Sequence, residues 1–194
     1  MQSLYTDVTY SFLTKLVHTS SKINIEEISE MGFTTEQANT IAGLPHSDVL
    51  KLSRIYKLID IDIDLVLFNR AVELAKSNHR AFDDIKDMHI THQLLRNIST
   101  LAADDASSAE IAESFGFDKK QMQIMAQLSI TDALTIARTG IVWYEITANE
   151  LRLSMALNYL QEMNRERDYL NQLVLKDASW PMVHALTGLG KAAF

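Results

Sequence analysis

One stretch of this chain occurs twice. Residues 26–54 align without a gap with residues 110–138 when the first stretch is shifted by 84 positions. The identical pairs are Glu26/Glu110, Gly32/Gly116, Phe33/Phe117, Gln37/Gln121, Ala42/Ala126, Leu44/Leu128, Asp48/Asp132, Leu50/Leu134 and Arg54/Arg138. Self-similarity at a fixed period is typical of repeated structural units. We therefore expect two tandem units, residues 1–84 and 85–168, followed by a C-terminal apolar tail, residues 169–194, that packs on the body or on a partner.

The fold class expected for both units is mainly α. Apolar residues recur at helical spacing in both, and Thr34 with Gln37 and Asp118 with Gln121 fit capping boxes that begin a helix. Pro45 forces a turn, so residues 34–57 predict a helix–turn–helix-like pair. Further helices are expected over 2–20, 65–76, 88–101 and 148–163, and irregular structure over 77–87, 102–109 and 164–168.

Two short segments have the pattern of β-strands. Isoleucine and aspartate alternate from Ile59 to Asp64, which is the period of a half-buried strand, and residues 141–146 are also β-prone. A lone strand leaves its backbone groups unpaired. The two segments can pair with each other or with a strand from another chain.

The composition limits the classes of function. The chain has no cysteine, which excludes disulfides, a zinc–thiolate site and thiol catalysis. Neither a membrane-spanning apolar run nor the basic leader of a signal peptide is present, so a cytoplasmic location is expected. The net charge of −7 is unusual for a protein that binds nucleic acid unaided. DNA binding would require that the 18 basic residues be segregated or that a basic partner supply phosphate contacts.

Metal and catalytic signatures are weak. The aspartates at 60, 62 and 64 resemble the start of a calcium loop, but Leu65 and Ala71 stand where an EF-hand needs glycine and glutamate. His89 and His92 lie three residues apart with aspartates nearby, and no third ligand follows at a defined spacing. Nucleophile and phosphate-loop motifs are absent. We expect no enzyme, no cofactor and no metal site.

Basic residues in the helix–turn–helix-like pair are the first candidates for DNA contact. Lys51, Arg54 and Lys57 are spaced to project broadly from one side of a helix, where they would contact phosphates or bases. The alternative is a solvated helix face. The second unit keeps only Arg138 of this set.

Arginines in the expected closing loops form a second group of candidates. Arg80, Arg165 and Arg167 lie in polar segments at the ends of the two units. An arginine on such a loop can reach a phosphate or the minor groove. It can equally pair with the aspartates beside it.

The first unit resembles the D subunit of the flagellar master transcriptional regulator of enteric bacteria. The resemblance covers roughly residues 4–84 and is carried by LYTDVTYSFLTKL, by MGFTTEQANTIAGLPHSDVLKLSRIYKLIDIDID and by HRAFDD at 79–84. The second unit is similar to the same pattern but weaker. The chain therefore looks like two such subunits fused in tandem, as in the related activators of conjugative elements.

The resemblance implies a partner and a mode of action. D-type subunits assemble with a C-type subunit that carries a four-cysteine zinc site and much of the DNA contact. Arg80 matches the family's loop arginine and is expected to contact DNA or to order that loop. The expected function is a subunit of a bacterial transcription activator that binds promoter DNA within a hetero-oligomer. The alternative is an interaction adaptor or anti-activator that never touches DNA.

Overall fold

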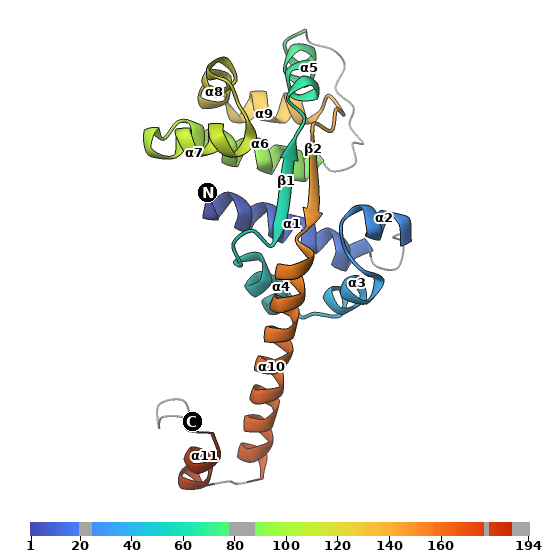
Figure 1. Cartoon of the computed structure of the whole chain (residues 1–194), viewed down its shortest axis with the longest axis vertical. Coiled ribbons are helices and arrows are strands. Elements are labelled where there is room, and N and C mark those ends of the chain that lie inside the picture. The colour runs from blue at the N-terminus through green and yellow to red at the C-terminus, as the bar shows by residue number, and fades with distance from the viewer. Residues whose placement is uncertain (20–24, 78–87, 177–178, 188–194) are drawn as a thin grey trace. The chain divides into compact units, whose positions relative to one another are not determined.

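The computed structural model describes residues 1–19, 25–77, 88–176 and 179–187. Of the described residues, 74% are helical and 6% lie in strands. The mainly α fold class is confirmed, and a single two-stranded sheet accompanies the helices in the described part of the chain (Figure 1). None of the described helices combines the length and the apolarity needed to cross a lipid bilayer.

The elements follow one another in an order that recurs. We call residues 1–84 the first copy and residues 85–168 the second copy. The first copy contains α1 (Gln2–Thr19), α2 (Ile25–Glu30), α3 (Thr35–Ala42), α4 (His46–Ser53), β1 (Ile59–Ile63) and α5 (Leu65–Lys76). The second copy contains α6 (Met88–Ala102), α7 (Asp105–Phe115), α8 (Lys119–Ala126), α9 (Ile130–Ala137), β2 (Tyr144–Ala148) and most of α10 (Glu150–Leu175). The last helix is α11 (Trp180–Thr187).

The correspondence between the copies has one irregularity. The bounds of α8 and α9 are those of α3 and α4 shifted by 84 residues. The bounds of β2 and the start of α10 are those of β1 and α5 shifted by 85. The link between the second short helix and the strand is therefore one residue longer in the second copy, where it contains Gly140.

The two strands pair with each other. β1 and β2 are antiparallel, and Ile61 faces Ile146 at the centre of the ribbon. Alternate side chains of β1 point to opposite sides, so Ile59 and Ile61 are buried while the aspartates between them are exposed. Because Ile61 and Ile146 occupy equivalent positions in the copies, the ribbon has a local twofold relation.

Hydrogen bonds at the two ends of the ribbon repeat this relation. The N–H of Asp64 donates to the carbonyl of Trp143 at 2.8 Å. The N–H of Asn149 donates to the carbonyl of Leu58 at 2.9 Å. Leu58 and Trp143 are both fully buried, so a buried apolar residue precedes each strand. A polar residue, Asp64 or Asn149, follows each strand and precedes a helix.

The helices of the two copies pack against each other within one body. α1 contacts α3, α4 and α6, and α6 in turn contacts α7, α8 and α9. α5 of the first copy packs against α9 of the second copy (Figure 1). Large buried side chains at this junction include Phe68, which lies edge-on to Trp143 with ring centroids 5.2 Å apart. The core therefore combines residues from both copies.

The predicted starts of α3 and α8 are confirmed. Thr34 with Gln37 and Asp118 with Gln121 each form a complete capping box. Gly32 ends the turn after α2 with a φ of +76°, in the left-handed region that glycine adopts without steric cost. Its position also brings the chain against β2, where the carbonyl of Met31 accepts a hydrogen bond from the N–H of Ala148 at 2.8 Å.

Three sequence-based boundaries are wrong. Residues 102–109 were expected to be irregular, but α7 begins at Asp105, since alanine favours helix and aspartate favours its first turn. Residues 164–168 were expected to close the second copy, but they lie inside α10, because glutamate and arginine are good helix formers. The helix expected to reach residue 57 ends at Ser53.

The chain divides into two compact units, Met1–Leu153 and Ser154–Phe194. The expected boundary between the copies, at residue 84, lies inside the first unit. The second unit holds the remainder of α10 together with α11, in which Val183 is fully buried while Met182 is exposed.

Candidate nucleic-acid interface

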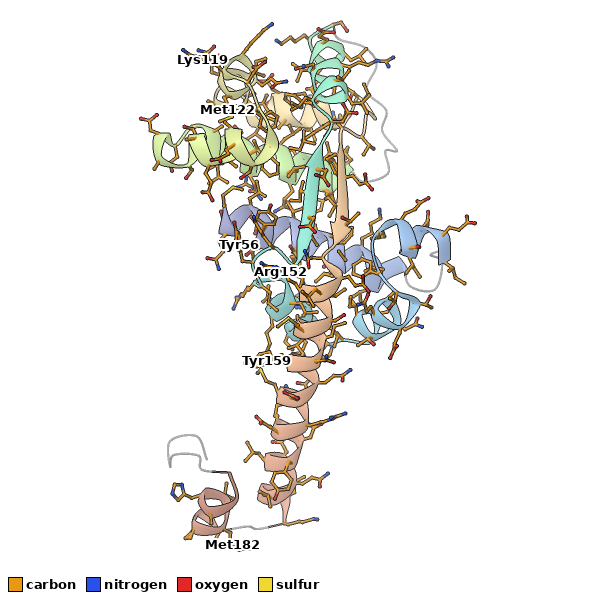
Figure 2. The ribbon with its side chains drawn as sticks, viewed as in Figure 1. Tyr56, Lys119, Met122, Arg152, Tyr159 and Met182 are labelled. Carbon is orange, nitrogen blue, oxygen red and sulfur yellow. The ribbon has the colours of Figure 1, made fainter. Side chains whose placement is uncertain are left out.

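The turn between α4 and β1, residues 54–58, is the centre of the candidate site. Arg54 and Lys57 lie in it, and Lys51 lies in the last helical turn before it. Arg152 reaches it from α10 (Figure 2). We call Lys51, Arg54, Lys57 and Arg152 the basic cluster. The side chains of all four are exposed.

Lys51 forms an ion pair with Asp48. Its Nζ lies 2.6 Å from Oδ1 of Asp48, which is fully buried in the first turn of α4. Much of the Lys51 charge is therefore offset, so we expect it to contribute less to phosphate binding than its neighbours.

Arg54 and Lys57 do not share a helix face with Lys51, contrary to the sequence-based expectation. Arg54 is the C-cap of α4, and its backbone N–H donates to the carbonyl of Lys51 at 3.2 Å. Lys57 lies beyond the helix with a φ of +56°, which is uncommon for a residue other than glycine. The two cations are thus presented from the end of a helix and from a turn.

An exposed aromatic side chain lies among these cations. Tyr56 is 39% exposed, and the Nζ of Lys57 lies 5.6 Å from the centroid of its ring. On its other side the ring meets Tyr5 edge-on at 5.3 Å between centroids. Burial raises the pKa of Tyr5, and the nearby Tyr56 and Asp60 raise it further, so its hydroxyl stays protonated at neutral pH.

Arg152 was missed by the sequence analysis. It lies in the first turn of α10, and its Nη1 donates to the carbonyl of Tyr56 at 2.9 Å. The equivalent position in the first copy is Leu67, so the repeat gives no signal for an arginine. Its contact joins residues 96 apart in the chain, which only the pairing of β1 with β2 brings together.

Of the remaining predicted arginines, Arg138 lies in the first compact unit but belongs to a different turn. Arg80 falls outside the described residues. Arg138 is the half-buried C-cap of α9 in the second copy, equivalent to Arg54. Arg165 and Arg167 are exposed on α10 within the second compact unit rather than on a loop.

The face of the ribbon beside the cluster is acidic. Asp60 and Asp62 of β1 are exposed, and Glu145 of β2 is exposed directly opposite Asp62. Asp60 accepts a hydrogen bond from Nδ2 of Asn149 at 3.1 Å. These carboxylates repel phosphate, so they oppose the approach of a DNA backbone along the ribbon.

The histidine pair shows no metal-binding arrangement within the described residues. His89 is exposed and His92 is half-buried on α6. Burial lowers the pKa of His92, and the nearby Arg96 and His89 lower it further. The described residues hold no group of three potential ligands. The aspartates at 84 and 87 lie outside them.

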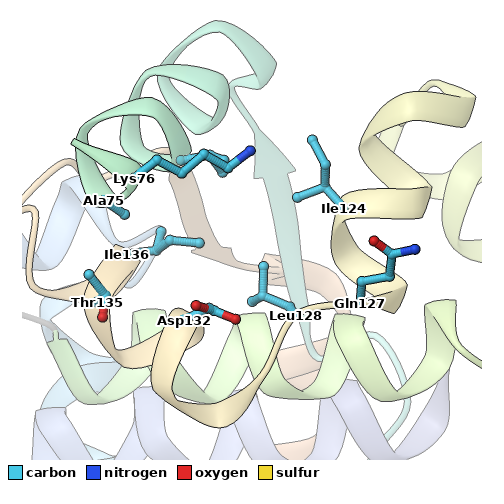
Figure 3. A pocket seen from close by; sticks show the side chains of 9 residues that line it. Ala75, Lys76, Ile124, Gln127, Leu128, Asp132, Thr135 and Ile136 are labelled. Atoms are coloured by element: carbon cyan, nitrogen blue, oxygen red, sulfur yellow. The ribbon is translucent and has the colours of Figure 1, made fainter. Parts of the chain in front are cut away.

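A pocket of about 260 Å³ lies between α5, α8 and α9 (Figure 3). It is lined by Val72, Ala75, Lys76, Ile124, Gln127, Leu128, Asp132, Thr135 and Ile136. The hydroxyl and N–H of Ser129 donate to Asp132 and hold its pKa below the ordinary value, so this carboxylate is charged at neutral pH. The pocket is small beside typical ligand sites of roughly 300–1,000 Å³.

Comparisons with known proteins place the chain in a family. No curated protein and no solved structure matches the chain significantly. The family model described as "Protein of unknown function (DUF2857)" matches residues 91–194, from α6 to the C-terminal end of the sequence. This match covers more than half of the chain. The chain therefore belongs to the DUF2857 family of proteins of unknown function.

Proposed function

We propose that this chain is a non-enzymatic, cytoplasmic subunit of a bacterial transcription activator, and that it binds promoter DNA through the basic cluster within a hetero-oligomer. One observation carries the proposal. Arg54 and Lys57 are exposed in the same turn as Tyr56, the Nζ of Lys57 lies over the exposed ring of Tyr56, and neither cation has a carboxylate within ion-pair distance among the described residues. Unpaired cations beside an aromatic ring suit a phosphate backbone and its sugars or bases.

The acidic charge of the chain supports a shared rather than an independent interface. A net charge of −7 opposes association with DNA, so most phosphate contacts would come from a basic partner. The partner proposed from the resemblance to the flagellar regulator is a C-type subunit with a four-cysteine zinc site. The resemblance also supports a common origin of the two copies by tandem duplication, and the recurring order of elements supports the same view.

Exposed apolar side chains on α10 offer a surface for that partner. Met155 and Tyr159 lie four residues apart within the second compact unit and are 64% and 61% exposed. Residues at this spacing lie on one face of a helix. A row of large apolar groups in water is typical of a helix that docks into an apolar groove.

The first experiment tests the DNA contact. The chain is co-expressed with the product of the neighbouring gene, and the purified complex is titrated onto upstream promoter DNA at several salt concentrations. The variant Arg54→Ala/Lys57→Ala is expected to bind more weakly, with a log–log salt slope that is shallower by about 1.8, since each phosphate contact contributes about 0.9. Lys119→Ala/Lys120→Ala, which removes the same charge from exposed positions of α8, serves as the matched control.

The outcome separates local contact from net charge. If the control variant loses as much affinity as the test variant, the effect comes from overall charge and the proposal fails. The other predicted contacts, Arg80, Arg138 and Arg165, are tested one by one as alanine variants in the same assay. Arg80→Ala is expected to weaken binding most of the three, because Arg80 matches the loop arginine of the resembled family.

The second candidate function is an adaptor or anti-activator without DNA contact. The acidic face formed by Asp60, Asp62 and Glu145 favours it, because such a face repels DNA and can occupy a basic surface of a partner. In this case the complex binds promoter DNA no better than the partner alone. Asp62→Lys would then release the partner, whereas Arg54→Ala/Lys57→Ala would leave the complex intact.

A further inference from the structure

We infer that Arg152 is a positioning residue that clamps the turn 54–58 in the conformation that presents Lys57 and Tyr56 to DNA. The inference rests on the proposed function and deepens it. A residue of the second copy thereby restrains the candidate site in the first copy. The hydrogen bond from Nη1 of Arg152 to the carbonyl of Tyr56, at 2.9 Å, is its starting point.

The backbone of the turn needs restraint at one residue. Lys57 has a φ of +56°, a region that costs energy for a side chain with a Cβ and persists where the surroundings hold it. Lys57 also carries the charge that the site uses. A relaxed turn would move this side chain and the preceding ring away from their present directions.

The start of α10 holds the carbonyls on both sides of Lys57. Arg152 donates to the carbonyl of Tyr56, and the N–H of Asn149 donates to the carbonyl of Leu58 at 2.9 Å. Asn149 and Arg152 are themselves joined, because Oδ1 of Asn149 accepts the backbone N–H of Arg152 at 3.2 Å. The first turn of α10 and the residue before it therefore hold the peptide group that precedes Lys57 and the one that follows Leu58.

The equivalent turn in the second copy provides an internal comparison. There the left-handed residue is Gly140, with a φ of +73°, which adopts this conformation without strain. The bond equivalent to that of Asn149 is kept, from Asp64 to Trp143. The position equivalent to Arg152 is Leu67, whose side chain cannot donate a hydrogen bond. By the shift of 85, Gly140 matches Ile55 rather than Lys57, so the left-handed residue lies earlier in the second turn. The turn whose left-handed residue is charged has the arginine clamp, and the turn whose left-handed residue is glycine lacks it.

Substitutions at Arg152 separate positioning from direct phosphate contact. Arg152→Gln removes the charge but keeps a side-chain donor for the Tyr56 carbonyl. Arg152→Ala removes both. If Arg152 positions the turn, Arg152→Gln keeps most of the DNA affinity, and Arg152→Ala lowers it roughly tenfold, which is the weight of one hydrogen bond at the upper end of its range.

A double-variant cycle gives the second readout. A residue that acts through Lys57 has little further effect once that side chain is removed, so Arg152→Ala/Lys57→Ala should bind about as well as Lys57→Ala. A residue that contacts phosphate itself would add its own loss and make the salt slope shallower by a further ~0.9. Additive losses with this change in slope would overturn the inference.

Amide hydrogen exchange tests the clamp without DNA. In the full chain, Arg152→Ala should accelerate exchange in the turn 54–58 roughly tenfold, while exchange in the turn 138–142 of the second copy stays unchanged. Unchanged exchange in the first turn would overturn the inference even if DNA binding fell. If the wild-type complex does not bind promoter DNA, the proposed function fails, whereas the exchange experiment still decides whether Arg152 restrains the turn.

Discussion

At the scale of single residues, the two copies contain matched glycines in different surroundings. Gly32 and Gly116 both have left-handed backbones, with φ of +76° and +70°. A Cβ at Gly32 would lie 2.9 Å from the backbone N of Ala148 and 3.0 Å from its carbonyl oxygen. A Cβ at Gly116 would meet only Cδ1 of Leu65, at 3.8 Å. The first glycine is therefore required for conformation and for space, and the second for conformation alone.

This difference predicts unequal costs for the same substitution. Gly116→Ala should lower the free energy of unfolding by about 1–2 kcal/mol, the cost of placing an alanine in the left-handed region. Gly32→Ala should cost about 3 kcal/mol or more, because it also forces α2 and β2 apart. Urea denaturation followed by circular dichroism measures both. Equal losses would show that the contact between Gly32 and Ala148 is not tight in solution.

At the scale of elements, the exposed face of the ribbon carries an unfavourable pair. Asp62 and Glu145 face each other across the strands, and like charges directly opposite destabilise a sheet. Glu145→Lys should raise the free energy of unfolding by about 0.5–1 kcal/mol, since it turns repulsion into attraction. Glu73→Lys, at an exposed position on α5, makes the same change in net charge and should leave stability nearly unchanged. Comparable gains in both variants would assign the effect to net charge.

The N-terminus of α9 predicts a dependence of stability on pH. The side chain and the N–H of Ser129 donate to Asp132, and these bonds lower the pKa of Asp132. A carboxyl whose pKa is lower in the folded state stabilises the fold above its unfolded pKa of about 4 and loses this contribution as the pH falls through the folded value. Ser129→Ala should remove the side-chain part of the lowering, which is the larger part, and cost about 1 kcal/mol at pH 7, with a smaller difference from wild type at low pH. An NMR titration of the Asp132 carboxyl checks the pKa directly.

The short helices were predictable because their signals are local. Capping boxes, a left-handed glycine and a proline each act within a few residues, and they mark the starts of α3 and α8 and the turn before α4 correctly. The end of α4 was not predictable, because Lys57 takes a left-handed conformation that no local feature of its side chain favours. This conformation of Lys57 depends on contacts between its turn and α10, a helix that is distant in the sequence.

The candidate site was only partly predictable for the same reason. Arg54 and Lys57 stand out in the sequence as cations near a helix–turn–helix-like pair, whereas Arg152 joins them only through the pairing of β1 with β2. Tyr56 becomes a site residue only once the fold exposes it between these cations. Spacing within one helix could not reveal a cluster assembled from both copies.

At the scale of the whole molecule, the shared core predicts that the copies depend on each other. The family match begins in α6 and excludes α1, β1 and α5. Yet β2 pairs with β1, α6 packs against α1, and the buried ring of Trp143 lies against Phe68. A fragment of residues 85–194 would expose the edge of β2 and the ring of Trp143 to water.

We therefore expect this fragment to lack a cooperative thermal transition. In a Trp180→Phe background, where Trp143 is the remaining tryptophan, the fragment should emit fluorescence at a longer wavelength than the full chain. Addition of residues 1–84 in trans should restore both signals, since it returns the missing half of the ribbon and the surface of α1. Self-association of the fragment with recovery of both signals would also fit, because the local twofold relation about Ile61 and Ile146 allows β2 to pair with another β2. A monomeric fragment that melts cooperatively would instead show that the second copy folds without the first, and that the ribbon joins two independent bodies.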